Sequence, residues 1–213
     1  MPLAIPHQLA TGFVASLLNY AATFIIPSSR LLQDPLDTLS TAIPILALGH
    51  ATLLVLTLLF IKHQTVKQTL SSLGFAILAA IVGVGVLHGL IVLFGAPLLD
   101  KFNHTLAFAT YLSIITVIPT FTALAPADSS VWVKAFLQHC PTETVEIYAY
   151  SQAICTLSGA WIGAIVLPLD WERDWQVWPI SCIISTYLGH SVGVMAAFGW
   201  SSFKMVFGKK KTD

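Results

Sequence analysis

The stretch that decides the fold is LSSLGFAILAAIVGVGVLHGLIVLF, which runs from Leu70 to Phe94 and contains no Asp, Glu, Lys or Arg. An α-helix rises about 1.5 Å per residue, and the hydrocarbon core of a bilayer is about 30 Å thick, so about 20 apolar residues suffice to cross it. Because the stretch is continuously apolar and long enough, it predicts a transmembrane helix.

Five more stretches of the chain meet the same criterion. A barrel is disfavoured because its strands would alternate in polarity over about ten residues, whereas these runs are continuous. The sequence therefore predicts an all-α fold: a polytopic membrane protein with a bundle of about six transmembrane helices, in a single membrane-embedded domain over residues 1–213. The predicted spans are 7–26, 39–61, 70–94, 104–125, 147–169 and 179–203.

The composition agrees with a chain dissolved in lipid. Of the 213 residues, 56% are hydrophobic and 9% are charged, against about 25% charged residues in soluble domains. Ten Lys and Arg balance ten Asp and Glu, so we expect no nucleic-acid partner. The three cysteines are too few and too scattered in the sequence to predict a disulfide framework or a metal cluster. We expect no cofactor and no metal.

The distribution of basic residues predicts the orientation, because Lys and Arg near span ends are retained on the cytoplasmic side. With six spans both termini share a face, and that face carries seven Lys and Arg against three on the other. The imbalance predicts cytoplasmic termini. The seven are Lys62, Lys67, Lys134, Lys204, Lys209, Lys210 and Lys211, and the three are Arg30, Lys101 and Arg173.

Two short motifs bear on processing and location. Asn103-His104-Thr105 is a glycosylation sequon on the predicted luminal side, but its acceptor lies almost against the membrane, so we do not expect modification. Lys210 and Lys211 stand fourth and third from the carboxyl end, which resembles the dilysine signal that returns membrane proteins to the endoplasmic reticulum. The alternative is a basic tail that anchors the last helix at lipid headgroups.

Three pairs of glycines with a four-residue spacing lie within the predicted spans. Lipid is as apolar as leucine, so membrane helices associate through close backbone approach and interhelical hydrogen bonds, and small residues mark such contacts. One interpretation is packing within the bundle; the other is that one of these faces docks a different membrane protein. The pairs are Gly85 and Gly89, Gly159 and Gly163, and Gly189 and Gly193.

Several polar side chains interrupt the apolar spans, where they are costly and usually face the bundle interior or a cavity. His50, His88 and His190 are joined by Asn19 and Gln152. These residues form interhelical hydrogen bonds or line a polar cavity for a lipid headgroup. Metal binding is disfavoured, because no histidine has a second ligand at helical spacing.

The densest polar segment is the loop from Asp170 to Pro179, which holds three carboxylates, one guanidinium and three indoles. Tryptophans suit the headgroup belt of a membrane protein, so the loop reads as a cap anchored at the luminal interface. Recognition of a lipid-linked glycan or of a partner protein is the second interpretation. Catalysis or cation binding by the acids is the third, although Arg173 would compete for them by forming ion pairs.

A membrane serine protease site is not supported by the sequence. Such a site needs a serine beside a glycine-built oxyanion site and a histidine on a neighbouring helix. Ser158, Gly159 and His190 fit this loosely, but Thr156 stands where the rhomboid motif needs glycine. Phosphate-binding glycine loops are also absent from the sequence.

Two blocks of sequence resemble the Pig-F family of glycosylphosphatidylinositol (GPI) anchor biosynthesis. The first block begins with GAWIGA at Gly159 and continues through PLDWER at Pro168 and WQVWPISC at Trp175. The second is GAPL at Gly95, with His88 seven residues before it. Chain length and the number of predicted spans also agree with that family.

The resemblance implies a non-catalytic subunit of the ethanolamine phosphate transferases of the endoplasmic reticulum membrane. Their catalytic subunits carry a luminal, metal-dependent domain that transfers phosphoethanolamine to the anchor precursor, and the small subunit stabilises them. The expected partners are these catalytic subunits and membrane lipids, including the GPI precursor. The residues expected to bind partner or lipid are His88, Asp170, Trp171, Glu172, Arg173, Trp175, Gln176 and Trp178.

Two other functions stay open from the residues alone. A membrane enzyme would use the luminal carboxylates on a lipid-linked substrate. A transporter or scramblase of a lipid intermediate would use the intramembrane histidines, although the internal repeat common in transporters is missing.

Overall fold

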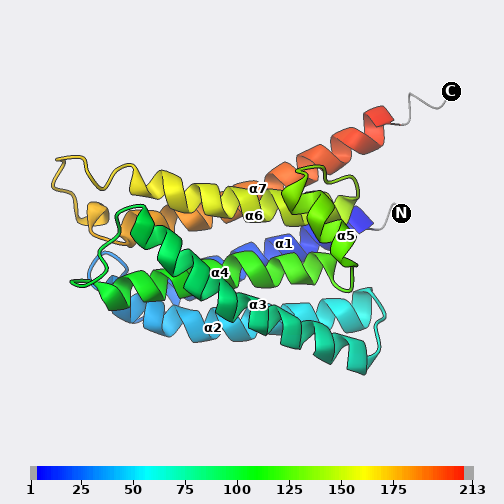
Figure 1. Ribbon diagram of the computed structural model, residues 1–213, viewed down its shortest axis with the longest axis horizontal. Helices are drawn as coiled ribbons and strands as arrows, with labels where there is room; N and C mark the ends of the chain where they lie inside the picture. The colour runs from blue at the N-terminus through cyan, green and yellow to red at the C-terminus, as the bar shows by residue number, and fades with distance from the viewer. Residues whose placement is uncertain (1–3, 209–213) are drawn as a thin grey trace.

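All the regular structure is helical in the computed structural model, which describes residues 4–208, so the all-α prediction is confirmed (Figure 1). Four of the six long helices are α-helical throughout, and the other two each run into a short π-helical turn. The elements are α1 (Ala4–Tyr20), η1 (Ala21–Ile25), α2 (Pro35–Leu56), η2 (Thr57–Ile61), α3 (Val66–Leu93), α4 (Phe102–Leu124), α5 (Ser129–Trp132), η3 (Val133–Leu137), α6 (Thr144–Ala164), η4 (Asp174–Gln176) and α7 (Ile180–Gly208).

Each of the six predicted spans corresponds to one long helix, with ends that differ by a few residues. The largest differences are at α7, which continues to Gly208 rather than ending at residue 203, and at α6, which ends at Ala164 rather than at residue 169. Ile165 and Leu167 then make turn hydrogen bonds to the carbonyls three residues earlier. Pro168 explains the early end, because proline cannot donate to a helix and disfavours helical backbone just before it.

Four helices are long and apolar enough to cross a membrane by length and composition. They cover Pro35–Ile61, Val66–Leu93, Phe102–Leu124 and Ile180–Lys204, and a shorter apolar helix covers Ala10–Ile25. Helix α6 is not among them, because glutamate, glutamine and several hydroxyl side chains lower its hydropathy. The chain thus has the helices of a multi-pass membrane protein, and the count of six spans stays a prediction.

Local sequence explains where the helices begin. The Asp34 carboxylate accepts the backbone N–H groups of Leu36 and Asp37 at 3.1 and 2.9 Å, and Pro35 opens α2. Thr65 and Gln68 form a reciprocal capping box at the start of α3. Such caps satisfy the first N–H groups of a helix, which have no partner within it.

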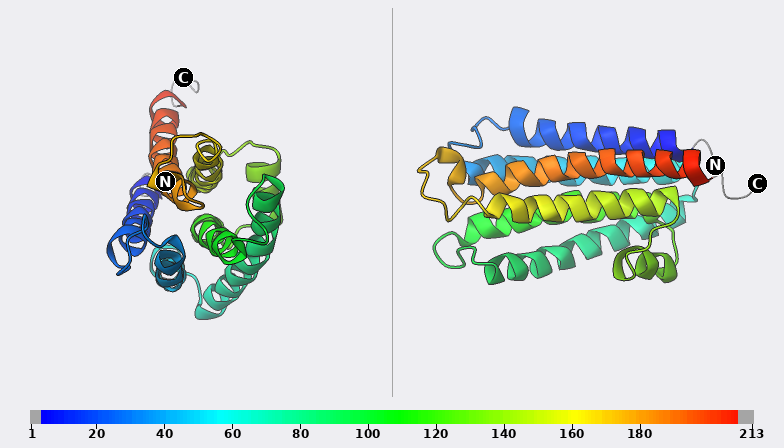
Figure 2. Two further views of the ribbon diagram at one scale, coloured as in Figure 1. Left: turned by 90° about the vertical axis from the view of Figure 1, so that its left-hand side faces the viewer. Right: turned by 90° about the horizontal axis from the view of Figure 1, so that it is seen from above.

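Helix α4 is the centre of the bundle. It packs against α2, α3 and α6, and the end-on view shows it enclosed by other helices (Figure 2). Of its most apolar stretch 72% is buried, whereas the figure for α3 is 11%. Helix α3 therefore lies at the periphery, resting mainly on α4.

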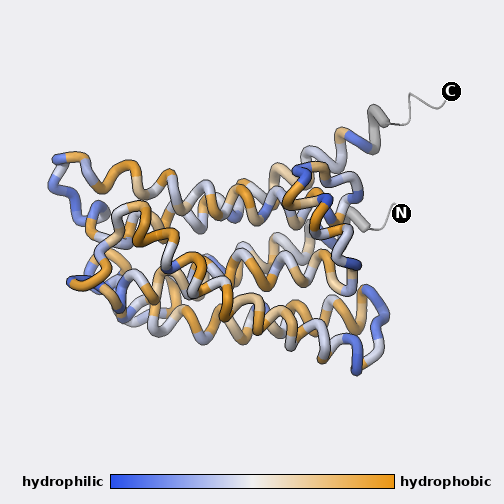
Figure 3. The backbone as a smooth tube through the Cα atoms, in the orientation of Figure 1, coloured by the Kyte–Doolittle hydropathy of each residue, from blue (hydrophilic) through white to orange (hydrophobic). Residues whose placement is uncertain are grey.

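The loops gather at the two ends of the bundle. The loops before α2, α4 and α7 share one end, and the loops before α3 and α6 share the other end with the described ends of the chain (Figure 1). Hydrophilic segments concentrate at these ends and apolar ones lie between them (Figure 3). The number of membrane crossings and the cytoplasmic placement of the termini stay predictions.

Two features at the end that holds the termini were not foreseen from the sequence. Helices α5 and η3 form a short excursion between α4 and α6, where Trp132 packs against Phe121 with 4.7 Å between ring centroids. The Lys62 ammonium donates to the carbonyls of Ala123 and Ala125 at 2.6 and 2.7 Å. It thereby caps the carboxyl end of α4, where the helix dipole favours a cation.

Candidate functional site: the glycine faces and the tryptophan loop

Helices α6 and α7 meet along four glycines, which we call the α6–α7 seam: Gly159, Gly163, Gly189 and Gly193. A Cβ added at Gly163 would lie 2.7 Å from Cys182 Cα, and one added at Gly193 would lie 2.7 Å from Ser151 O. At Gly159 and Gly189 an added Cβ would overlap a backbone carbonyl of the facing helix. These glycines are therefore occupied by contacts within the chain.

The third glycine pair is open. Gly85 and Gly89 lie on α3, and an added Cβ at either position would meet nothing within 4 Å. Neighbouring apolar side chains are exposed as well: Leu78, Ile81, Val82 and Val86 are each more than half exposed. We call this surface the α3 face. Of the three predicted glycine pairs, Gly85 and Gly89 are the pair that leaves room for another membrane helix.

His88 is placed between the two open glycines in sequence and lies near the start of α4. Its ring packs edge-on against Phe102, with 5.3 Å between centroids. The Nδ1 atom is buried and makes no hydrogen bond to any residue between 4 and 208. His88 is therefore separate from the other two intramembrane histidines.

The remaining polar side chains of the spans pair with one another inside the bundle. The His50 Nε2 atom lies 2.8 Å from the Asn19 Oδ1 atom and joins α2 to α1. The Gln152 amide donates to Ile115 O at 2.8 Å and lies 3.0 Å from His190 Nδ1, which joins α6 to α4 and α7. All four polar side chains are buried, so they serve the packing of the bundle.

Neither a protease dyad nor a metal site is assembled from the described residues. Ser158 is exposed, whereas His190 is fully buried and bonded to Gln152. Among residues 4–208 no three His, Cys, Asp or Glu side chains are grouped to hold a metal ion.

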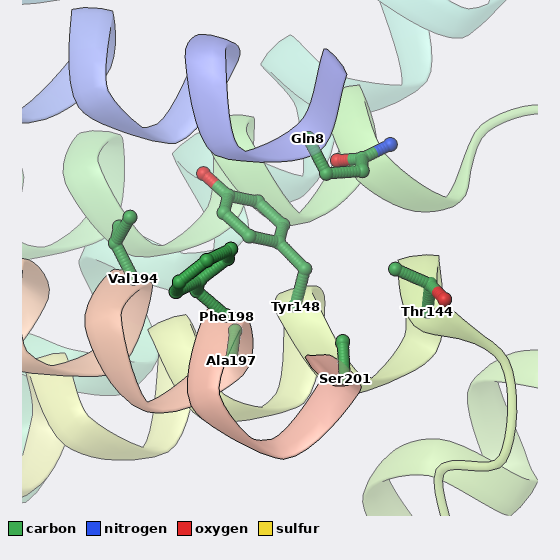
Figure 4. A pocket seen from close by; sticks show the side chains of 7 residues that line it. All are labelled: Gln8, Thr144, Tyr148, Val194, Ala197, Phe198 and Ser201. Carbon is green, nitrogen blue, oxygen red and sulfur yellow. The ribbon is translucent and has the colours of Figure 1, made fainter. Parts of the chain in front are cut away.

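The cavity between α1, α6 and α7 has a volume of about 10 Å³, and Tyr148 points across it toward α1 (Figure 4). It has room for about one water molecule.

The base of the loop between α6 and α7 is fixed to the bundle. The Trp178 indole N–H donates to Thr105 Oγ1 at 3.1 Å, and its ring packs edge-on against Phe108. The Gln176 amide donates to the carbonyls of Val166 and Leu169, both at 2.7 Å. Thr105 was noted in the sequence as part of a sequon, and no sequence signal pairs it with Trp178.

The tip of the same loop is exposed. The exposed side chains include Asp170, Glu172, Arg173 and Asp174, and Trp171 is 54% exposed while its ring packs edge-on against that of Trp175. Within the described chain the ion pair found is Lys134 with Glu146, so the expected pairing of Arg173 with the loop acids is not present. The tip thus presents unpaired charges and an indole to its surroundings.

The retrieval signal predicted at Lys210 and Lys211 lies outside the described residues. Asn103 of the sequon lies in the first turn of α4, and Thr105 is fully buried there.

Comparison with known proteins identifies relatives over most of the chain. The model of the "GPI biosynthesis protein family Pig-F" matches residues 14–198. A protein of Yarrowia lipolytica named glycosylphosphatidylinositol anchor biosynthesis protein 11 is 33% identical over 98% of this chain and 91% of its own length.

Two mammalian relatives match over a shorter region. Proteins of Mus musculus and Homo sapiens named GPI ethanolamine phosphate transferase, stabilizing subunit, are 39% and 38% identical. The matches cover 54% and 53% of this chain and 52% and 51% of theirs. No solved structure matches. Because the family model covers most of the chain and the yeast relative covers nearly all of it, this chain belongs to the Pig-F family of GPI biosynthesis proteins.

Proposed function

We propose that this chain is a non-catalytic membrane subunit that binds and stabilises the catalytic subunit of a GPI ethanolamine phosphate transferase in the endoplasmic reticulum. Membership of the Pig-F family and the names of the two mammalian relatives support this assignment. In this assignment the chain crosses the membrane six times with cytoplasmic termini, and the transferase chemistry belongs to the partner.

The partner docks on the α3 face. The single observation that carries this part of the proposal is that Gly85 and Gly89 meet nothing within 4 Å, whereas the other two glycine pairs are filled by contacts within the chain. Membrane helices gain most from close approach where both backbones can touch, and two glycines one turn apart permit it. A transmembrane helix of the catalytic subunit fits this surface.

The test is co-purification of the transferase with the double variant Gly85→Leu, Gly89→Leu. Leucines in place of the glycines hold a partner helix away, so we expect the recovered transferase to fall by about tenfold, equivalent to about 1.4 kcal/mol. The matched control is Gly199→Leu, which adds the same side chain at an open position on α7. Recovery of the transferase with the double variant at the level of the control would exclude the α3 face.

The exposed tip of the loop between α6 and α7 supports the partner's luminal domain or the entrance for its lipid substrates. Its unpaired charges and exposed indole are the features that a partner would contact. The double variant Glu172→Ala, Trp171→Ala removes one of each kind and is expected to lower transfer activity of the complex. The control is Trp161→Ala, which truncates an exposed tryptophan on α6. Unchanged activity would leave the loop a structural role only.

An enzyme in its own right would behave differently. Purified alone with phosphatidylethanolamine and an anchor precursor, this chain is expected to show no turnover with or without added divalent metal. Metal-dependent turnover under those conditions would replace the accessory role by a catalytic one. Lipid flipping in liposomes that contain only this chain would instead support a scramblase.

A further inference from the structure

A second surface, away from the α3 face, is hollowed. A cavity of about 280 Å³ lies between the first turns of α3, the last turn of α4 and helix α5. Figure 1 shows α4 passing between α3 and α5 in this part of the molecule. The lining divides into a polar group, Gln68, Ser71 and Ser72, and an aromatic group, Phe75, Phe121 and Trp132.

The polar lining offers hydrogen-bond donors without partners. Ser72 is 8% exposed, and its hydroxyl makes no hydrogen bond to any residue between 4 and 208. The Gln68 Oε1 atom already accepts from Thr65 N and Thr65 Oγ1, at 3.1 and 2.9 Å, which leaves its NH₂ group. The Trp132 indole can only donate. None of the lining residues is charged, so the cavity suits a neutral group rich in acceptor oxygens.

The depth of the cavity in a bilayer follows from the length of α3. Its 28 residues rise about 42 Å, which exceeds the hydrocarbon core by about 6 Å at each end. Gln68 is then among the headgroups, Ser71 and Ser72 are at the edge of the hydrocarbon, and Phe75 is within it. The lining therefore changes from polar to aromatic at the depth where a phospholipid changes from ester to acyl chain.

We propose that this cavity binds one glycerophospholipid of the surrounding bilayer. The ester carbonyls accept from Ser71, Ser72 and Trp132, and the first part of one acyl chain lies against Phe75 and Phe121. This site is independent of the partner: it rests on the cavity and its donors, and on the chain crossing a membrane.

Native mass spectrometry of the full chain with its co-purified proteins tests the site. The complex is placed in nanodiscs that contain equal amounts of palmitoyl-oleoyl-phosphatidylcholine and its diether analogue, which lacks both carbonyl oxygens. After transfer to detergent we expect one lipid to be retained, with the ester form preferred about fivefold, equivalent to about 1 kcal/mol, because the diether cannot accept the hydrogen bonds of the cavity. Equal retention of both lipids would overturn the proposal.

Variants of the lining residues test whether the lipid is bound in this cavity. Trp132→Phe keeps an aromatic wall but removes one donor, and should reduce the ester preference; Ser72→Phe fills the cavity and should abolish retention. The control is Leu70→Phe, an exposed position on the opposite side of α3. Co-purification of the transferase should be unaffected in all three variants. Retention of the ester lipid by both cavity variants at the level of the control would also overturn the proposal.

Discussion

The α6–α7 seam and the α3 face carry the same glycine spacing and have opposite surroundings. In the seam, glycines of two helices face each other and leave no room for one further carbon atom, whereas on α3 two glycines face open space. The comparison teaches that the spacing specifies only that two backbones can approach closely. Whether the approaching backbone comes from the same chain or from another protein is decided by what the rest of the fold covers.

Identical substitutions in the two regions give the largest expected difference. Gly189→Val places side-chain carbon against the Cys155 carbonyl and should destabilise the bundle by about 3 kcal/mol or more, because overpacking forces the helices apart. Gly85→Val should leave the bundle unchanged. The measurement is the thermal unfolding midpoint of each variant in the same detergent. Equal midpoints would contradict the claim that Gly189 is tightly packed and Gly85 is open.

The hydrogen bonds beside the seam give the next largest effect. Gln152→Leu removes the amide that bonds Ile115 O and His190, and leaves both buried groups without this partner. We expect a loss of about 2 kcal/mol, the upper end of what interhelical hydrogen bonds contribute in membranes. Chemical unfolding checks this value. The folded fraction of this variant should still bind the transferase through the α3 face. Lost binding by the folded fraction would contradict the view that Gln152 stabilises the bundle and the α3 face binds the partner.

Trp178→Phe tests whether the loop base belongs to the same rigid region as the seam. Phenylalanine keeps an aromatic ring next to Phe108 but removes the indole N–H that donates to Thr105. We expect a loss of about 1 kcal/mol, which is the usual contribution of one buried hydrogen bond. Thermal unfolding measures it. Thr105→Val should cost less in the Trp178→Phe variant than in the unchanged chain, because the loss that remains is that of the bond from the Thr105 hydroxyl to Pro97 O. Full additivity of the two losses would show that the bond is not the reason for either.

A dependence of stability on pH is expected from Lys62, which lies just before α3. Burial lowers the pKa of Lys62 from 10.5 to about 8. Below pH 8 the lysine is protonated in both the folded and the unfolded chain, and between pH 8 and 10.5 the unfolded chain holds more protons. The free energy of unfolding should therefore rise with pH across this window. Unfolding of Lys62→Met, measured over the same pH range, should lack that rise, and an identical pH profile would contradict the burial of the ammonium.

The sequence predicted the helices well because each one is encoded locally. Continuous apolar stretches and their flanking polar residues placed the six helices to within a few residues, with the largest differences at the carboxyl ends of α6 and α7. The short helix α5 was missed because four residues, Ser129–Trp132, are too few for a periodic pattern.

The contacts could not be predicted, because they join residues far apart in the chain. Trp178 donates a hydrogen bond to Thr105, which lies 73 residues earlier in the chain. Lys62 caps α4 at Ala123, which lies 61 residues later. The local sequence around Trp178 or Lys62 does not indicate which residue it will contact. For the same reason the three glycine pairs were indistinguishable in the sequence. Only the arrangement of the helices separates the two buried pairs from Gly85 and Gly89.

The most direct test of the proposed role is a crosslink in intact membranes. A photoreactive amino acid replaces Gly85 in one variant and Gly199 in another, since both positions are open. We predict that irradiation joins the catalytic subunit of the transferase to the chain modified at position 85 and not to the chain modified at position 199. A crosslink from position 199 alone, or the same yield from both, would contradict docking on the α3 face.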